Sequence, residues 1–319
     1  MRPVLILNRR HLSIKASWTR LTSINHKKFS IVGFHAIGYD WETLITYFKE
    51  PVPLENYILR IKFKSISQDN FIQSYFPGNT TVYPQDRQLI LTQFGKHAVR
   101  QLFPCWDHEA FKATFKIIIE HSEQYTALSN MPLSRSYDDD NIIMIRSTFD
   151  TTPIMSIHQL VIVLLPFTVI PNSQFRTVHT WCESNVVLTM LFTTSFANKV
   201  PNHLHRYTNI PPEIPKIDHV VIWDAPYSEA HWGLIIHKES DVIYNKATDS
   251  TIVKIQVATS VANQVAHQWF GGLVTPNSWT HSWLSKSFAM FLSHYALDQI
   301  VLYFNASSKN ITLNIAMRY

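Results

Sequence analysis

The side chains whose types and spacing bear on chemistry lie in the C-terminal part of the sequence. Asn263 and His267 are four residues apart, so they share one face of a helix, and Gln264 directly follows Asn263. Two ligands at that spacing can reach one metal ion, and imidazole is a common ligand of Zn²⁺. An amide oxygen is a poor zinc ligand, and a glutamine cannot accept a proton at neutral pH. Alone, His267 is more simply interpreted as a core histidine.

Two helices are predicted around these residues. Val–Ala pairs recur every four residues from Val257 to Ala266 and are followed by Trp269, which indicates an amphipathic helix. We expect this helix to end at the glycine pair 271–272. A second helix is predicted over 279–295. Its apolar side is formed by Trp279, Trp283, Phe288, Leu292 and Tyr295.

The first half of the chain has the pattern of β structure. Apolar and basic residues alternate over 57–64, which is the period of a half-buried strand. A similar alternation over 111–119 and apolar segments at 142–149 and 159–165 predict three more strands. Because no helical pattern lies between these segments, we expect them to form an antiparallel sandwich-like domain. A proline-bearing connection at 209–215 separates this domain from the helical part. The predicted fold class is α+β.

Composition excludes several classes of protein. Hydrophobic residues make up 46% and charged residues 16%, which suits a packed core, and the length suits about two domains. Residues 1–64 hold eleven Lys/Arg and four Asp/Glu, which gives this segment a net charge of +7. The whole chain has a net charge of +5, so residues 65–319 carry a net charge of −2. A nucleic-acid-binding protein concentrates basic residues over its folded body, so we expect no nucleic-acid partner. The longest apolar stretch, 160–170, is far shorter than the ~20 residues of a membrane span.

Signals of cellular compartment point in different directions. Three glycosylation sequons begin at Asn79, Asn305 and Asn310. The apolar run Val4–Leu7 is too short for a secretory signal, and the acid-poor start is either a mitochondrial transit peptide or an irregular N-terminus. Cys105 and Cys182 can form at most one disulfide.

The segment around His267 resembles a known family. Residues 263–271 read NQVAHQWFG, which is similar to HExxHxWFG of the M1 zinc aminopeptidases, gluzincins that include aminopeptidase N. Eighteen residues separate His267 from Lys286, as in the family pattern HExxH-x18-E. Four more segments match in order: FPCWDHEAFKATF at 103–115, ALSNMP at 127–132, IPKID at 214–218 and WGLI at 232–235.

This resemblance covers about residues 50 to 300 and implies a domain organisation. After a poorly matched segment at 1–45, we expect an M1-type N-terminal β domain of saddle or sandwich form over 46–170. A partial thermolysin-like α/β catalytic domain is expected over 171–319. The sequence ends at Tyr319, before the family's catalytic tyrosine and C-terminal helical domain, so we expect a truncated copy with exposed apolar surface on its helices.

The resemblance also assigns roles to residues that have changed. The family's three zinc ligands correspond to Asn263, His267 and Lys286, of which only His267 is retained, and its general base corresponds to Gln264. A lysine ammonium repels a metal cation. We therefore expect no cofactor here, although the family uses Zn²⁺.

The substrate side departs from the family as well. The glutamate that binds a peptide's α-amino group in the family corresponds to Ala230. Glu229 is one residue away, so on a strand it faces the opposite side unless a bulge intervenes. Gln93 matches a family glutamine that lines the amino-terminal pocket.

Three functions fit these observations. The chain is an inactive homologue that binds a peptide or protein partner through the inherited cleft, an active zinc aminopeptidase with rebuilt ligands, or a gene fragment without a function of its own. A rebuilt metal site would draw on His281 or His294. The family contains membrane-anchored ectoenzymes and cytosolic forms, so the resemblance leaves the compartment and the oligomeric state open.

Overall fold

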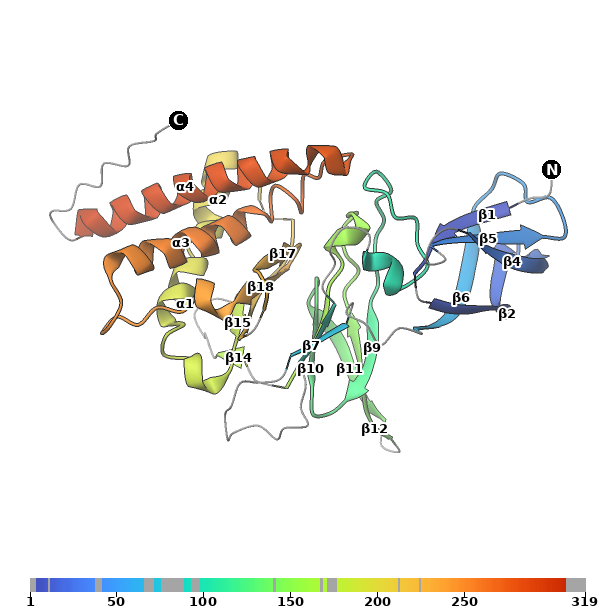
Figure 1. The fold of residues 1–319 in the computed structure, drawn as a ribbon, viewed down its shortest axis with the longest axis horizontal. Helices are drawn as coiled ribbons and strands as arrows, with labels where there is room; N and C mark the ends of the chain where they lie inside the picture. The colour runs from blue at the N-terminus through green and yellow to red at the C-terminus, as the bar shows by residue number, and fades with distance from the viewer. Residues whose placement is uncertain are drawn as a thin grey trace. The chain divides into compact units, whose positions relative to one another are not determined.

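The structure is a computed structural model that divides into two compact units (Figure 1). The first unit comprises Met1–Gln73 and Thr92–Phe111, and the second comprises Ser74–Leu91 and Lys112–Tyr319. The residues that the structure describes are 4–10, 12–37, 42–65, 72–75, 89–92, 98–139, 142–166, 169–170, 177–211, 213–223 and 225–307.

The first unit is built from two antiparallel three-stranded sheets. The first sheet has the order β1 (Val4–Asn8), β5 (Thr43–Phe48), β4 (Ile31–Ile37). The second has the order β3 (Lys28–Phe29), β2 (Leu12–Ser23), β6 (Tyr57–Ser65). Buried Leu21, Phe29 and Phe48 come from both sheets and form a shared core. Strand β6 confirms the predicted alternation over most of its length, because Leu59 and Ile61 are half-buried and the basic residues of the strand are exposed, although Phe63 is exposed as well.

Two further sheets contain antiparallel strand pairs. One has the order β10 (Thr126–Ser129), β13 (Ile162–Leu165), β8 (Leu89–Thr92), β7 (Ile72–Tyr75). The other has the order β11 (Leu133–Asp139), β12 (Ile142–Phe149), β9 (Ile118–Ser122). Strand β12 has the predicted bounds, whereas β13 begins late because Ile157–Gln159 forms a 3-10 turn. The strand predicted over 111–119 is wrong except at its end. Residues before Ile118 make only scattered backbone bonds, such as that between Ala113 and Met155, so no regular ladder forms.

A five-stranded sheet forms the centre of the second unit. Its order is β14 (Val169–Ile170), β15 (Val178–Trp181), β16 (Ile217–Ile222), β18 (Leu234–Lys238), β17 (Glu229–His231). The strands β15, β16 and β18 are parallel, and both outer pairs are antiparallel. Every residue of β16 is buried, as expected for a parallel strand covered on both faces.

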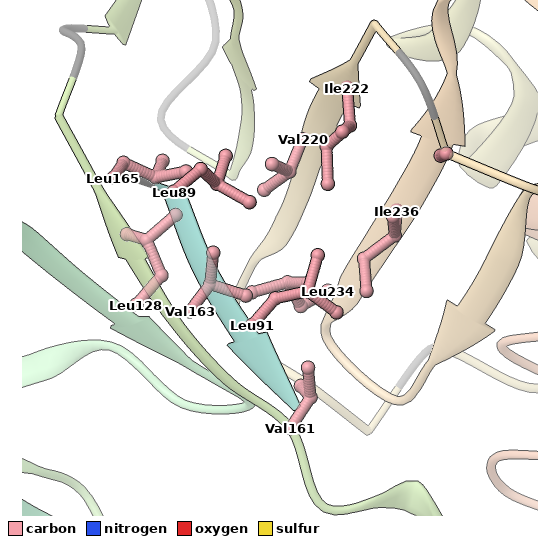
Figure 2. Close-up of a cluster of buried hydrophobic side chains, with 11 residues drawn as sticks. Leu89, Leu91, Leu128, Val161, Val163, Leu165, Val220, Ile222, Leu234 and Ile236 are labelled. Atoms are coloured by element: carbon pink, nitrogen blue, oxygen red, sulfur yellow. The ribbon is translucent and has the colours of Figure 1, made fainter. Parts of the chain in front are cut away.

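One face of this sheet closes on the antiparallel strands β8, β10 and β13. Figure 2 shows Val220, Ile222, Leu234 and Ile236 opposite a row of leucines and valines from those strands. Because this core joins strands before and after residue 170, the compact units of the structure are divided differently from the predicted domains 46–170 and 171–319. Those domain bounds stay a prediction.

Four α-helices lie in the described part of the second unit, and α3 and α4 pack side by side (Figure 1). They are α1 (Leu191–Ala197), α2 (Val200–Thr208), α3 (Thr251–Ala266) and α4 (Ser282–Ser307). The structure thus has antiparallel β-sheets followed by a mixed α/β part with helices, which confirms the predicted α+β class. No helix in the described ranges is long and apolar enough to cross a membrane.

Two details of the helices differ from the prediction. Helix α3 ends at Ala266 instead of at the glycine pair, because Gln268 and Trp269 donate to carbonyls three residues back and tighten the chain into turns. Helix α4 buries Leu292 on a stripe with Ala289 and Ala296. The predicted apolar residues Trp283 and Phe288 are exposed, as are Met290 and Phe291.

The cysteines and sequons are placed as follows. Cys105 and Cys182 are both buried free thiols, and burial raises the pKa of each thiol to about 12. Asn305 lies in the last turns of α4, whereas the sequons at Asn79 and Asn310 lie outside the described residues.

Candidate functional site

Helix α3 brings the first group of predicted site residues to its C-terminal end. The Ser250 hydroxyl accepts the backbone N–H of Val253 and caps the helix start. Val257, Val261 and Val265 recur every four residues and are buried, which fixes the rotation of the helix. Residues 263, 264 and 267 are consequently half-buried at the edge of that apolar stripe.

His267 is the C-cap of α3 and is held as a neutral imidazole. Its Nδ1 lies 3.0 Å from the carbonyl oxygen of Phe270, so Nδ1 carries the proton and Nε2 keeps its lone pair. Burial lowers the pKa of His267, and the charge of Lys286 lowers it further. Lys286 lies on α4, and the stacked rings of Phe270 and Phe288, whose centroids are 4.8 Å apart, join that helix to the turn after α3.

Asn263 and Gln264 differ in how their amides are satisfied. The Oδ1 atom of Asn263 is buried and has no hydrogen-bond partner among the described residues. The Nε2 atom of Gln264 lies 3.5 Å from the carbonyl oxygen of Ser228, at the start of β17. Helix α3 is thereby in contact with the strand that carries Ala230.

Ala230 lies at the centre of β17, an edge strand of the five-stranded sheet. Residues 229, 230 and 231 pair in regular register with Ile236, Ile235 and Leu234. No bulge intervenes in this pairing, so Glu229 and Ala230 point to opposite faces. Glu229 instead shares a face with His231, and their side chains are 3.8 Å apart. Gln93 lies outside the described residues.

Three buried or half-buried amide side chains position this strand, and sequence reasoning missed all of them. Gln268 donates to the carbonyl of His231 at 3.0 Å and accepts the backbone N–H of Gly233 at 2.8 Å. Gln159 accepts the backbone N–H of Trp232 at 2.8 Å and donates to the carbonyl of Gly271 at 2.7 Å. The turn between β17 and β18 is thus tied to the residues that follow α3.

Asn130 completes this arrangement. Its Nδ2 donates to the carbonyls of Gln159 and Trp232 at 2.6 and 2.8 Å. Gly233 has φ of +87°, and a Cβ at this position would collide with the carbonyl oxygen of Asn130. Only glycine suits this turn, because other residues rarely adopt that conformation and the backbone leaves no room. The sequence signal was present in the matched segments ALSNMP and WGLI, although their contact was not foreseen.

A buried ionic cluster lies at the start of β16. Lys216 donates to the carboxylate of Asp218 and to the carbonyl of Ser129, and Nδ1 of His179 lies 2.9 Å from the other carboxylate oxygen. Burial alone would raise the pKa of Asp218, but the adjoining Lys216 and His179 lower it below its usual value. The matched segment IPKID at 214–218 thus supplies both members of a buried ion pair.

Three buried histidines lie on neighbouring strands of this sheet. Nδ1 of His219 is 2.8 Å from Nε2 of His237, and their rings are stacked. The outer nitrogens, His219 Nε2 and His237 Nδ1, are buried without hydrogen-bond partners in the described structure. Burial lowers the pKa of His219 and of His231 to about 4, and it lowers the pKa of His237 well below its usual value. All three side chains are neutral near pH 7.

These histidines predict a loss of stability in mild acid. Their folded pKa values lie below the unfolded value of about 6.5, so the unfolded chain binds protons that the folded chain does not as pH falls from about 6.5 to about 4. Each histidine should lower the free energy of unfolding by up to about 1.4 kcal/mol per pH unit in this window. Urea unfolding between pH 7 and pH 5 measures this slope. His231→Gln should reduce it, His281→Gln at an exposed site should not, and a flat profile would contradict the prediction.

The proposed site as a whole has an unusual set of donors for a metal centre. It offers one imidazole, two amides and one ammonium. No group of three or more His, Cys, Asp or Glu side chains that could hold a metal ion occurs in the part of the chain that the structure describes. His281 and His294 are exposed and belong to no such group.

Comparison with known proteins identifies relatives of the whole chain. Residues 2–158 match the Peptidase M1 N-terminal domain, and residues 192–318 match the Peptidase family M1 domain. The first match begins at residue 2, so it includes the segment 1–45 almost entirely, where no family motif was recognised.

Individual relatives are aminopeptidases and a related ectoenzyme. The chain is 29% identical to Aminopeptidase M1 of Arabidopsis thaliana over 299 residues, which cover 93% of this chain and 34% of the relative. It is 31% identical to Aminopeptidase M1-A of Oryza sativa subsp. japonica over 260 residues, or 81% of this chain and 29% of the relative. It is 28% identical to the thyrotropin-releasing hormone-degrading ectoenzyme of Homo sapiens over 259 residues, or 77% of this chain and 23% of the relative.

The chain therefore spans about a third or less of the length of these relatives. The two domain matches follow one another along the chain, with residues 159–191 between them. This chain is a homologue of the M1 aminopeptidases, with an M1 N-terminal domain followed by sequence of the M1 catalytic domain.

Proposed function

We propose that this chain is a catalytically inactive M1 homologue that binds peptides, or extended segments of proteins, at the inherited substrate site. The observation that carries the proposal is the donor set at the family's metal position. Only His267 is a zinc ligand of the ordinary kind there. Asn263 contributes an amide, and Lys286 contributes an ammonium that has no lone pair to donate.

These residues do not fit Zn²⁺. Two of three family ligands are replaced, and the charge of Lys286 opposes a metal cation near His267. Gln264 stands where the family has its general base, and its amide has no proton-accepting role at neutral pH. The side chains at these positions therefore cannot bind a metal ion that activates water, and none of them can take a proton from that water.

Peptide binding is supported by what surrounds this centre. Strand β17 is an edge strand, and extended peptides add to such edges through backbone hydrogen bonds. The side chains of Gln159 and Gln268 fix the end of β17, so the edge is held in place without a bound ligand. Because Ala230 has no carboxylate, recognition here should not require a free peptide amino group.

The relatives give the proposal its substrate class. Several are aminopeptidases by name, and one is an ectoenzyme that degrades thyrotropin-releasing hormone, so peptide recognition occurs among them. For this chain, which spans about a third of their length, peptide binding is a proposal and is tested separately from catalysis.

The test measures zinc, turnover and peptide binding on the same purified chain. We expect no stoichiometric zinc, no hydrolysis of amino-acyl amides with or without added Zn²⁺, and equal binding of labelled peptides with free and acetylated N-termini. Ala230→Trp should abolish peptide binding by placing a bulky side chain at the centre of β17, whereas Ala247→Trp, at an exposed turn, should leave it unchanged.

Three outcomes would contradict the proposal. Stoichiometric zinc with chelator-sensitive turnover would mean that other residues have rebuilt the metal site. Failure of the folded chain to bind any peptide would remove the binding function. Failure to obtain a soluble folded chain would favour a gene fragment.

A further inference from the structure

The outer face of the sheet β3-β2-β6 in the first unit carries a cluster of basic residues. Leu21 pairs with Leu59 and Phe29, and these three side chains point into the core of the unit. Side chains alternate along a strand, so their neighbours in sequence point outward. The outward and exposed basic residues, called the basic face below, are Arg20, Lys28, Arg60, Lys62 and Lys64.

The strands that carry this basic face contribute no negative charge to it. Strands β2, β3 and β6 contain no acidic residue. None of the five basic side chains makes an ion pair with a described residue, whereas nearby Lys27, outside the face, pairs with Glu50 at 3.4 Å. Five of the eleven Lys and Arg residues in this part of the sequence therefore lie on one side of one sheet.

The register of β2 and β6 places like charges opposite each other, which destabilises the folded sheet in the absence of a bound anion. Arg20 is directly opposite Arg60 in the ladder between β2 and β6. Like charges directly opposite each other destabilise a sheet. Lys62 and Lys64 continue along β6 at intervals of about 6.6 Å, which adds further repulsion. An external anion would remove this repulsion.

We infer that the basic face binds the surface of an anionic lipid bilayer. Its charges spread in two dimensions over three strands, which suits a planar array of headgroups better than a single linear chain of anions. Ile58 lies on the same face and is 51% exposed, so an apolar side chain is available at the level of the headgroups. The binding is peripheral and independent of the peptide site.

The electrostatics set the size of the expected effect. Each Lys or Arg near an anionic membrane surface strengthens binding by about fivefold. The attraction acts only within a Debye length, which shortens from about 10 Å at 0.1 M salt to about 3 Å at 1 M salt. Binding by the basic face should therefore be strong at low salt and lost at high salt.

The experiment is co-sedimentation of the full chain with vesicles of phosphatidylcholine, with and without phosphatidylserine. We expect binding only to vesicles that contain phosphatidylserine. Arg60→Gln with Lys62→Gln should weaken it about 30-fold, because two cations are lost. The matched control, Lys116→Gln with Lys246→Gln, removes the same charge from exposed positions in the second unit and should retain nearly full binding.

Several results would overturn the inference. Equal loss in both double variants would show that net charge, and not this face, drives the binding. Absence of binding to phosphatidylserine vesicles at low salt would refute it directly, as would salt-sensitive binding to heparin or RNA without any binding to vesicles. Thermal melting of both variants checks that each is folded.

Discussion

A chain with Asn263→His, Gln264→Glu and Lys286→Glu should bind one equivalent of Zn²⁺, which the native chain should not. The change restores two ligands beside His267 and replaces a repelling ammonium with a carboxylate. Loss of even an outer partner of a ligand lowers metal affinity by about 10–100-fold, so two restored ligands should raise it by at least about 10²–10⁴-fold. Equilibrium dialysis against buffered zinc measures the difference.

Partial variants separate metal binding from catalysis. Asn263→His with Lys286→Glu should bind zinc as tightly while Gln264 still lacks a basic group. Gln264→Glu alone should bind no zinc. We expect zinc to return before turnover, because Ala230 still lacks the carboxylate of the family's amino-group site. If the triple variant folds and binds no zinc, the assignment of residues 263, 267 and 286 to the metal position is wrong.

The structure clarifies why some elements were predictable. Strand β6 follows from local alternation, β12 from a short apolar segment, and α3 from a four-residue apolar repeat. The segment 111–119 has the same alternation, yet Phe111 is exposed and its neighbours form only isolated bridges. Alternation thus indicates a strand only where a partner strand is available along its length.

The positioning residues of the site were beyond the reach of local patterns. Asn130 and Trp232 are 102 residues apart in sequence, and Gln159 and Gly271 are 112 apart. A polar amide inside a matched segment gives no indication of which distant backbone group it satisfies. The family motif, by contrast, located residues 263 to 267 at the end of α3 and Ala230 on a neighbouring strand, because a motif records such long-range contacts indirectly.

The residues that hold β17 in place differ in their bonding from those at the family's metal and substrate positions. The side-chain amides of Asn130, Gln159 and Gln268 form hydrogen bonds with backbone groups around β17 and keep the strand and the following turn in place. The altered positions 263, 264, 230 and 286 make few of these bonds, so their replacement leaves the scaffold intact. This difference supports the proposal that the chain binds an extended peptide at β17 without a metal ion.

The buried pair Lys216 and Asp218 gives a second prediction of large effect, this time on stability. Both side chains are almost fully buried, and the carboxylate also bonds His179. Asp218→Asn removes the negative charge and leaves the Lys216 ammonium in a site without compensation. Breaking a buried pair in this way costs about 3–5 kcal/mol, a large part of the 5–15 kcal/mol that stabilises a typical domain.

Two control variants distinguish the cost of leaving the Lys216 ammonium unpaired from the loss of the attraction between the two charges. Lys216→Met with Asp218→Leu removes both charges, and it should be far closer to the native chain than Asp218→Asn, because buried pairs replaced by apolar residues are often neutral. Glu120→Gln breaks the exposed pair with Arg146, whose atoms are 3.8 Å apart, and should change stability by about 1 kcal/mol or less. Urea unfolding of the four proteins at pH 7 gives the comparison. If Asp218→Asn is no more harmful than Glu120→Gln, Lys216 is neutral in the folded chain and the cluster is held by hydrogen bonds alone.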